Sequence, residues 1–168
     1  MASFRAGDFD FIVLSAHIRW DKTGGEESRI RGLQLLADWV AKRRTEKYVT
    51  DKDFILMGDF NIPADDDELF AAITSKGLRM PVAMRGQHGS NLMRDKHYDQ
   101  ILHYPSEANT FTDYGGVLDF YKRSHRPLFP GIAMTKREFT YQMSDHLPLW
   151  VQLRTDVEDE RLDQILNR

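Results

Sequence analysis

Short apolar runs that stop at polar or turn-forming residues dominate the hydrophobic pattern of this chain. Residues Phe11–Leu14 are apolar throughout and lead into Ser15, and residues Phe54–Met57 are apolar and stop at Gly58. Runs of this length are typical of short strands that are covered on both faces. From Leu147 to Leu153, leucine or valine occupies every second position, which predicts a strand with one buried face.

Two segments have the apolar spacing of helices. Ser28 is a suitable N-cap for the first, and its apolar stripe consists of Ile30, Leu33, Leu36, Ala37 and Val40. The second is predicted from Glu68 to Ser75 and ends at Gly77. The run Asp65–Asp67 precedes it. These acids suit the first turn of a helix, which we favour over the alternative of a cation site.

Strands and helices therefore alternate, which predicts an α/β fold in one domain over residues 1–168. We expect irregular loops at residues 80–95 and 109–130, because both contain glycine-rich stretches. Residues 155–168 form an acidic and then weakly amphipathic C-terminal tail. No internal repeat or domain boundary is visible.

The composition is that of a globular protein, with 41% hydrophobic and 29% charged residues among 168. No apolar run has the length of a membrane helix, so we expect no membrane partner. The absence of cysteine excludes disulfides and thiolate zinc sites and is consistent with a cytoplasmic protein. The net charge of −3 argues against a protein that coats DNA nonspecifically, and any phosphate binding must be local.

Ionisable side chains gather where the predicted strands begin or end. Asp59 follows one apolar strand, His17 follows another, and Asp99 begins a third apolar run. Asp145 and His146 directly precede the alternating strand. Rigid strands hold carboxylates and imidazoles in fixed geometry, as a metal-assisted hydrolase requires. The alternative for each position alone is a turn with a hydrogen-bonded aspartate.

Four strings in this order resemble the endonuclease/exonuclease/phosphatase superfamily, the DNase I-like metal-dependent phosphoesterases. In chain order they are the strand that ends at His17, Gly58-Asp-Phe-Asn61, Tyr98-Asp-Gln-Ile-Leu102 and Ser144-Asp-His-Leu-Pro148. The resemblance extends from Asp8 to Leu153. It implies a four-layer α/β sandwich, of which this chain corresponds to the second half.

The first half of that family carries an Asn near the first strand and a metal-binding Glu, typically in a Gln-Glu pair. No Gln-Glu pair occurs in this chain. We therefore expect a single domain of this type that is incomplete at its N-terminal side and lacks the N-terminal strands.

The resemblance also implies roles for the residues in the strings. Asp59 would orient and deprotonate the attacking water, and Asp145 would bind Mg²⁺ (or Mn²⁺). His146 would donate a hydrogen bond to a phosphate oxygen, with Asp99 fixing its tautomer. Asn61 would hold the water or a phosphate oxygen, and in an extended segment it would point the same way as Asp59.

Two further residues extend this candidate site. His17 matches the family position that contacts the phosphate or the leaving group, and Arg19 would add a charge-assisted contact to substrate. The alternatives are a buried, hydrogen-bonded histidine and a surface salt bridge, respectively.

Together these features predict a metal-dependent phosphoester hydrolase, most simply an endonuclease acting on nucleic acid or another phosphodiester. Metal binding would be weak unless another acid replaces the absent Glu. The alternative is a catalytically inactive remnant that serves as an interaction module or as half of a split assembly.

The apolar strands also predict an unpartnered sheet face. Helices would cover one face, and the other would be exposed for lack of a second sheet. We expect a homodimer through that face. Cover by residues 109–130 and the C-terminal tail is the alternative.

Overall fold

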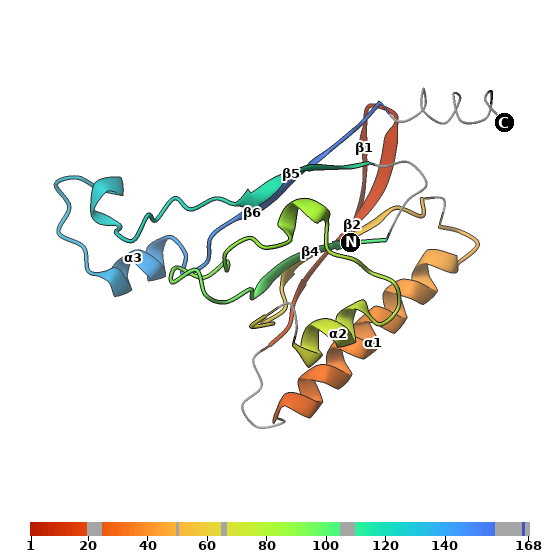
Figure 1. Ribbon diagram of the computed structural model, residues 1–168, viewed down its shortest axis with the longest axis horizontal. Helices are drawn as coiled ribbons and strands as arrows, with labels where there is room; N and C mark the ends of the chain where they lie inside the picture. Colours follow the sequence, from red (N-terminus) through yellow and green to blue (C-terminus); the bar gives the residue numbers. More distant parts are fainter. Residues whose placement is uncertain (20–24, 50, 65–66, 105–109, 157–165, 167–168) are drawn as a thin grey trace.

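The computed structural model describes residues 1–19, 25–49, 51–64, 67–104, 110–156 and 166. A four-stranded sheet in the order β1-β2-β3-β4 forms its centre (Figure 1). β2 and β3 run parallel, and the two outer pairs are antiparallel. The strands are β1 (Ala2–Ala6), β2 (Phe9–His17), β3 (Phe54–Asp59) and β4 (Asp99–His103). β2 and β3 confirm the strands predicted from the two apolar runs, whereas β1 was not predicted.

Helices α1 (Gly25–Thr45) and α2 (Glu68–Thr74) lie on one face of this sheet (Figure 1). The core between them and the sheet consists of apolar side chains and Tyr104, because alternate side chains of β2 and β3 point toward the helices. Its most buried members include Leu33, Val40, Phe54, Leu56, Leu69, Ile73 and Leu102. The predicted apolar stripe of the first helix is therefore the face that packs on the sheet.

The helix starts differ in how well the sequence predicted them. α1 begins at Gly25, so Ser28 lies inside its first turn and the prediction of Ser28 as N-cap was wrong. Glu26 and Glu27 occupy that first turn, where negative charge favours a helix N-terminus. In α2, Asp67 caps the helix by accepting a 2.7 Å bond from the backbone N–H of Leu69. The helix-terminus interpretation is thus confirmed for Asp67, and the other two aspartates lie outside the described residues.

A two-stranded antiparallel ribbon, β5 (Phe111–Val117) with β6 (Leu149–Leu153), lies against the other face of the sheet. β6 confirms the predicted alternating strand. The prediction of an irregular segment at residues 109–130 was wrong for β5 and holds for residues 118–125, which form no helix or strand. The glycines there serve packing. A Cβ on Gly115 would lie 2.9 Å from Ala83, which belongs to the short 3₁₀ helix η1 (Val82–Met84).

The ribbon covers this second face only in part. Ile55 and Ile101 are 3% and 7% exposed, whereas Phe4 at the far edge is 50% exposed. Phe4 stacks on Phe11 with ring centroids 5.6 Å apart, and Phe11 stacks on Phe9. Phe111 of β5 stacks on His103 of β4, and β6 also contacts β4, so the alternative of cover by residues 109–130 is realised only in part and an aromatic edge remains partly open.

Residues 118–143, here called the lobe, extend from the ribbon to one side of the molecule (Figure 1). The lobe contains η2 (Arg126–Leu128) and α3 (Lys136–Gln142), neither of which was predicted. Its core is small and consists of Tyr121 and Phe139 packed with Leu92 and Leu147. A capping box between Thr135 and Glu138 fixes the start of α3. Within the described part of the chain, no helix has the length and apolarity needed to cross a membrane.

Candidate active site

The carboxyl ends of β2 and β3 place His17 and Asp59 side by side. The two residues are paired in the sheet register, and His17 Nε2 lies 3.5 Å from Asp59 Oδ2. The strands approach closely here because Gly58 has no side chain. A Cβ at Gly58 would lie 1.9 Å from the carbonyl oxygen of Ala16. The glycine before Asp59 is therefore a packing requirement of the site.

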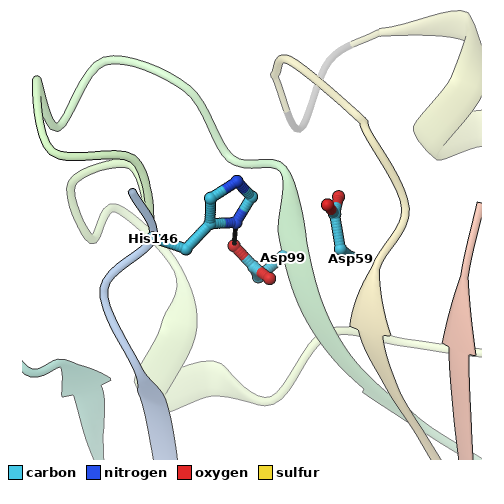
Figure 2. A group of neighbouring side chains, drawn as sticks. All are labelled: Asp59, Asp99 and His146. Carbon is cyan, nitrogen blue, oxygen red and sulfur yellow. Dashed lines mark hydrogen bonds and ion pairs between the residues drawn. The ribbon is translucent and has the colours of Figure 1, made fainter. Parts of the chain in front are cut away.

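His146 meets Asp99 from the other side of β4. Its Nδ1 lies 2.6 Å from Asp99 Oδ2, and its second ring nitrogen points away from that contact (Figure 2). The hydrogen bond to Asp99 raises the pKa of His146, against the opposing effect of burial, with added contributions from the negative charges of Asp99, Asp59 and Asp145. The positively charged imidazolium is therefore favoured here.

Asp59, Asp99 and His146 form one group of potential ligands (Figure 2). One donor atom from each lies within 4.8 Å of the other two. Carboxylate oxygens are the ligands that hard divalent cations prefer, so two carboxylates this close suit such an ion. The Asp99–His146 bond occupies one carboxylate oxygen, and the cation would use the remaining oxygens.

Asn61 adjoins the site with a different backbone conformation from the one predicted. Its φ is 53°, a left-handed conformation that asparagine tolerates, so the extended geometry assumed from the sequence was wrong. Its backbone N–H donates to Asp59 Oδ1 at 2.9 Å. Its side-chain amide donates to the carbonyl of Ile18 at 2.7 Å. Asn61 thus orients the Asp59 carboxylate and ties the end of β2 to the turn after β3.

His17, Arg19, Asp59 and Asn61 line an open pocket of about 530 Å³. The side chain of His17 is 74% exposed, so the alternative of a buried histidine was wrong. Arg19 is exposed as well and forms no ion pair with any described residue. The side chains of His17 and Arg19, which can both donate hydrogen bonds, therefore face solvent beside Asp59.

Asp145 stands next to this group without belonging to it. Its side chain is exposed, and its backbone carbonyl accepts a 3.2 Å bond from the N–H of Leu92. The negative charge of Asp145 contributes to the raised pKa of His146. Its expected role as the metal ligand stays a prediction.

Several residues that the sequence analysis did not single out hold the site together. The N–H of His146 donates to Ser144 Oγ, and the N–H of Asp99 donates to Ser90 Oγ. Ser90 is 1% exposed and lies in the segment at residues 80–95 that was expected to be a loop. Arg29 of α1 donates to the backbone carbonyl of Asn61. Ser144 could have been found from the sequence because it directly precedes Asp145-His146. Ser90 and Arg29 could not, because neither has a distinctive sequence context.

The expected convergence of distant residues is present. Asp59 ends β3, Asp99 begins β4 and His146 lies in the connection between α3 and β6, and the three side chains meet at one end of the sheet. Asn61, His17 and Arg19 adjoin them through the open pocket.

No protein-family model and no curated protein matches the chain. Solved structures do match. A mannosyl-6-phosphatase from Bacteroides thetaiotaomicron is 21% identical, with a TM-score of 0.56, over 87% of this chain and 52% of its own. An endonuclease/exonuclease/phosphatase family protein of the same organism is 21% identical, with a TM-score of 0.53, over 86% and 50%. Staphylococcus aureus beta toxin with bound magnesium ions is 14% identical, with a TM-score of 0.54, over 90% and 56%.

These similarities are too distant in sequence to carry an activity, and the chain spans about half the length of the solved structures it matches. The arrangement of strands and helices is nevertheless shared over most of this chain. The chain has the mixed α/β fold of the endonuclease/exonuclease/phosphatase, or DNase I-like, proteins.

Proposed function

We propose that this chain carries the hydrolytic site of a divalent-metal-dependent phosphoesterase, with phosphodiesters of the nucleic-acid type as substrates. The observation that supports this most is the Asp59–Asp99–His146 group at the end of the sheet. It combines a carboxylate, a charged hydrogen-bond donor and room for a cation, which are the parts that phosphoester hydrolysis requires.

Asp59 activates the water in this proposal. The water oxygen bonds to phosphorus, and the phosphorus–oxygen bond to the leaving alcohol breaks. One proton of the water passes to the Asp59 carboxylate, and the leaving oxygen takes up a proton from solvent. The hydrogen bond from the N–H of Asn61 holds the carboxylate so that its other oxygen faces the water.

His146 stabilises the charge that develops on the phosphoryl oxygens. Because Asp99 binds Nδ1, the opposite ring nitrogen is left to donate toward substrate. Asp99 is thus a positioning residue that fixes the ring and favours its charged form. His17 and Arg19 line the adjoining open pocket, where they are suited to bind the phosphate and the leaving group.

A divalent cation, Mg²⁺ or Mn²⁺, would neutralise part of the phosphate charge when bound. Asp59 and the neighbouring Asp145 are the carboxylates suited to hold it. We expect weak binding, because few carboxylates of the described residues reach the site. Titration calorimetry with MgCl₂ measures this binding directly. Wild-type protein should give a small binding heat, and Asp145→Ala should give none.

The proposal is tested by hydrolysis of bis(p-nitrophenyl) phosphate and of plasmid DNA with and without Mg²⁺. Asp59→Asn should lower the rate by about 100-fold or more, because it removes the general base and keeps the shape. Asp113→Asn is the matched control, since Asp113 is exposed on β5, away from the site. Wild-type protein without any metal-dependent activity would instead favour the inactive interaction module.

We also propose self-association through the part of the sheet that the ribbon leaves open. The partly exposed edge around Phe4 and Phe11 supports it, because a two-fold contact would bury the same aromatic strip on both copies. Light scattering at micromolar concentration tests the idea. A mass of 19.6 kDa would refute it, and Phe4→Ser should convert a dimer to that mass.

A further inference from the structure

The lobe differs in charge from the rest of the protein. It contains five lysine or arginine residues and two acids, whereas the whole chain has a net charge of −3. The five basic side chains are all exposed: Lys122, Arg123, Arg126, Lys136 and Arg137. A positive lobe on a negative protein concentrates attraction for anions at one place.

Both acids of the lobe are engaged in local structure. Asp119 pairs with Arg94 at 3.0 Å and accepts a 2.9 Å bond from the backbone N–H of Lys122. Glu138 accepts bonds from the N–H and the hydroxyl of Thr135 in the capping box. The five basic side chains therefore keep an unbalanced positive field.

The fold brings several of these basic residues together. Lys122 and Arg123 form a tight turn with φ values of 45° and 75°. The Nζ of Lys136 lies 6.0 Å from the ring centroid of Tyr121, the residue before that turn, so α3 begins beside it. Cations from two separate segments thus share one surface.

α3 also presents an exposed aromatic ring on the lobe. Arg137 and Tyr141 are four residues apart on the helix and lie on one of its faces. The Tyr141 ring is 92% exposed, whereas Phe139 on the opposite side is fully buried. A guanidinium beside an exposed aromatic ring combines phosphate binding with a platform on which a base can stack.

The lobe also borders the candidate active site. Phe120 and Met143, at its two ends, line the same pocket of about 460 Å³ as Asp99 and His146. Phe139 and Tyr121 pack in one cluster with Leu147, the residue after His146. A strand held on the lobe would therefore lead directly to the site.

We infer that the lobe is a binding surface for single-stranded nucleic acid, with Lys122, Arg123, Lys136 and Arg137 on the phosphates and Tyr141 stacked on a base. This deepens the proposed function by naming its substrate class, and it rests on that function for the chemistry. The binding itself needs no metal and no turnover. Single strands are favoured over duplex because stacking requires an unpaired base.

The decisive experiment is fluorescence anisotropy of a labelled single-stranded DNA oligonucleotide in EDTA, over a series of salt concentrations. Lys122→Asn with Arg123→Asn removes two charges while keeping a residue type that tolerates positive φ. It should lower the slope of log affinity against log salt by about 1.4, the value for two lost contacts on a single strand. The control, Lys42→Gln with Lys47→Gln near the end of α1, should leave the slope unchanged.

Tyr141→Ala provides an independent measure that does not alter charge. It should weaken binding about 10-fold at every salt concentration, with an unchanged slope. Circular dichroism shows whether each variant is folded. If the double turn variant is not, Lys136→Gln with Arg137→Gln replaces it.

Activity on bis(p-nitrophenyl) phosphate separates this inference from the proposed function. The lobe variants should hydrolyse that small substrate at the wild-type rate. Oligonucleotide binding that depends on the lobe supports the inference even if no hydrolysis occurs. Binding that is indifferent to the lobe variants overturns it, as does binding only to duplex DNA or only to anionic phospholipid vesicles, whether or not hydrolysis is present.

Discussion

The helix-covered sheet and the lobe bury apolar surface on very different scales. In the described residues, the core between α1, α2 and the sheet contains sixteen buried apolar residues, and the core of the lobe contains four. The sheet holds Asp59 and Asp99, whereas His146 lies at the junction with the lobe. The candidate site is therefore built from a rigid part and a weakly supported part, and the Asp99–His146 bond joins them.

The largest expected effect separates the two cores. Phe54→Ala should cost about 3–5 kcal/mol in the free energy of unfolding, because a fully enclosed ring is removed from the main core. That is a large share of the whole stability of a small domain. Urea denaturation followed by circular dichroism measures it.

Phe139→Ala is the matched change in the lobe, where the ring is equally buried. We expect the lobe to open locally while the sheet stays folded, since its few buried contacts end at Leu92 and Leu147. Hydrogen exchange should show lost protection confined to residues 118–143 and the neighbourhood of His146. Equal loss of protection in β2 and β3 would mean that both regions form one cooperative unit.

A second comparison uses glycine. Gly58→Ala should destabilise the sheet by about 1–3 kcal/mol, because its Cβ would overlap the Ala16 carbonyl oxygen and its φ is +142°. Gly32→Ala in α1 meets no atom within 4 Å and should stabilise by about 0.5–1 kcal/mol. Thermal unfolding of both variants tests whether the close approach at the site is a real constraint. A Gly58→Ala variant at least as stable as wild type would show that it is not.

Helix caps give a smaller effect on each side of the comparison. Asp67→Ala should reduce global stability by about 1 kcal/mol, because α2 loses its N-cap bond to Leu69. Thr135→Ala removes the corresponding bond in α3 and should act on the lobe alone. A global unfolding midpoint that falls for Asp67→Ala and is unchanged for Thr135→Ala is expected. A reversed pattern would contradict the division into two regions.

The finest probe is the titration of His146. Since the bond to Asp99 raises its pKa above the ordinary 6.5, Asp99→Asn should lower that pKa. The raised pKa means that the bond stabilises the fold fully at pH values below 6.5, and that this stabilisation is lost as pH rises through the folded-state value. Proton NMR of the imidazole in EDTA measures the shift. An unchanged pKa in the variant would show that the two regions are not joined by this bond.

The sequence predicted most where physical periodicity is strong. The apolar runs before Gly58 and Ser15 and the stripe through Leu33 and Val40 identified the strands and the main helix. The apolar pattern failed at β5, because Gly115, which looks like a turn former in the sequence, instead provides close packing against Ala83 of η1. The lobe helix escaped prediction because only Phe139 of its residues is buried, which leaves no apolar stripe to read.

The candidate site shows the same division. Asp59, Asp99, His146 and His17 were predicted because each stands beside a strand, where an ionisable residue is conspicuous. Asn61 was placed correctly but with the wrong conformation, because its left-handed φ goes with a side-chain bond to the carbonyl of Ile18, which is 43 residues away in the chain. Ser90 and Arg29 could not be predicted, because only the folded chain brings them next to Asp99 and Asn61.

The most direct test of the account is a double-mutant cycle of Asp99→Ala and His146→Ala, measured as Mg²⁺-dependent hydrolysis of bis(p-nitrophenyl) phosphate. If Asp99 acts by positioning His146, the double variant should be about as active as His146→Ala alone, because residues that act as a unit are not additive. Losses that simply multiply, or single variants as active as wild type, would contradict the site described here.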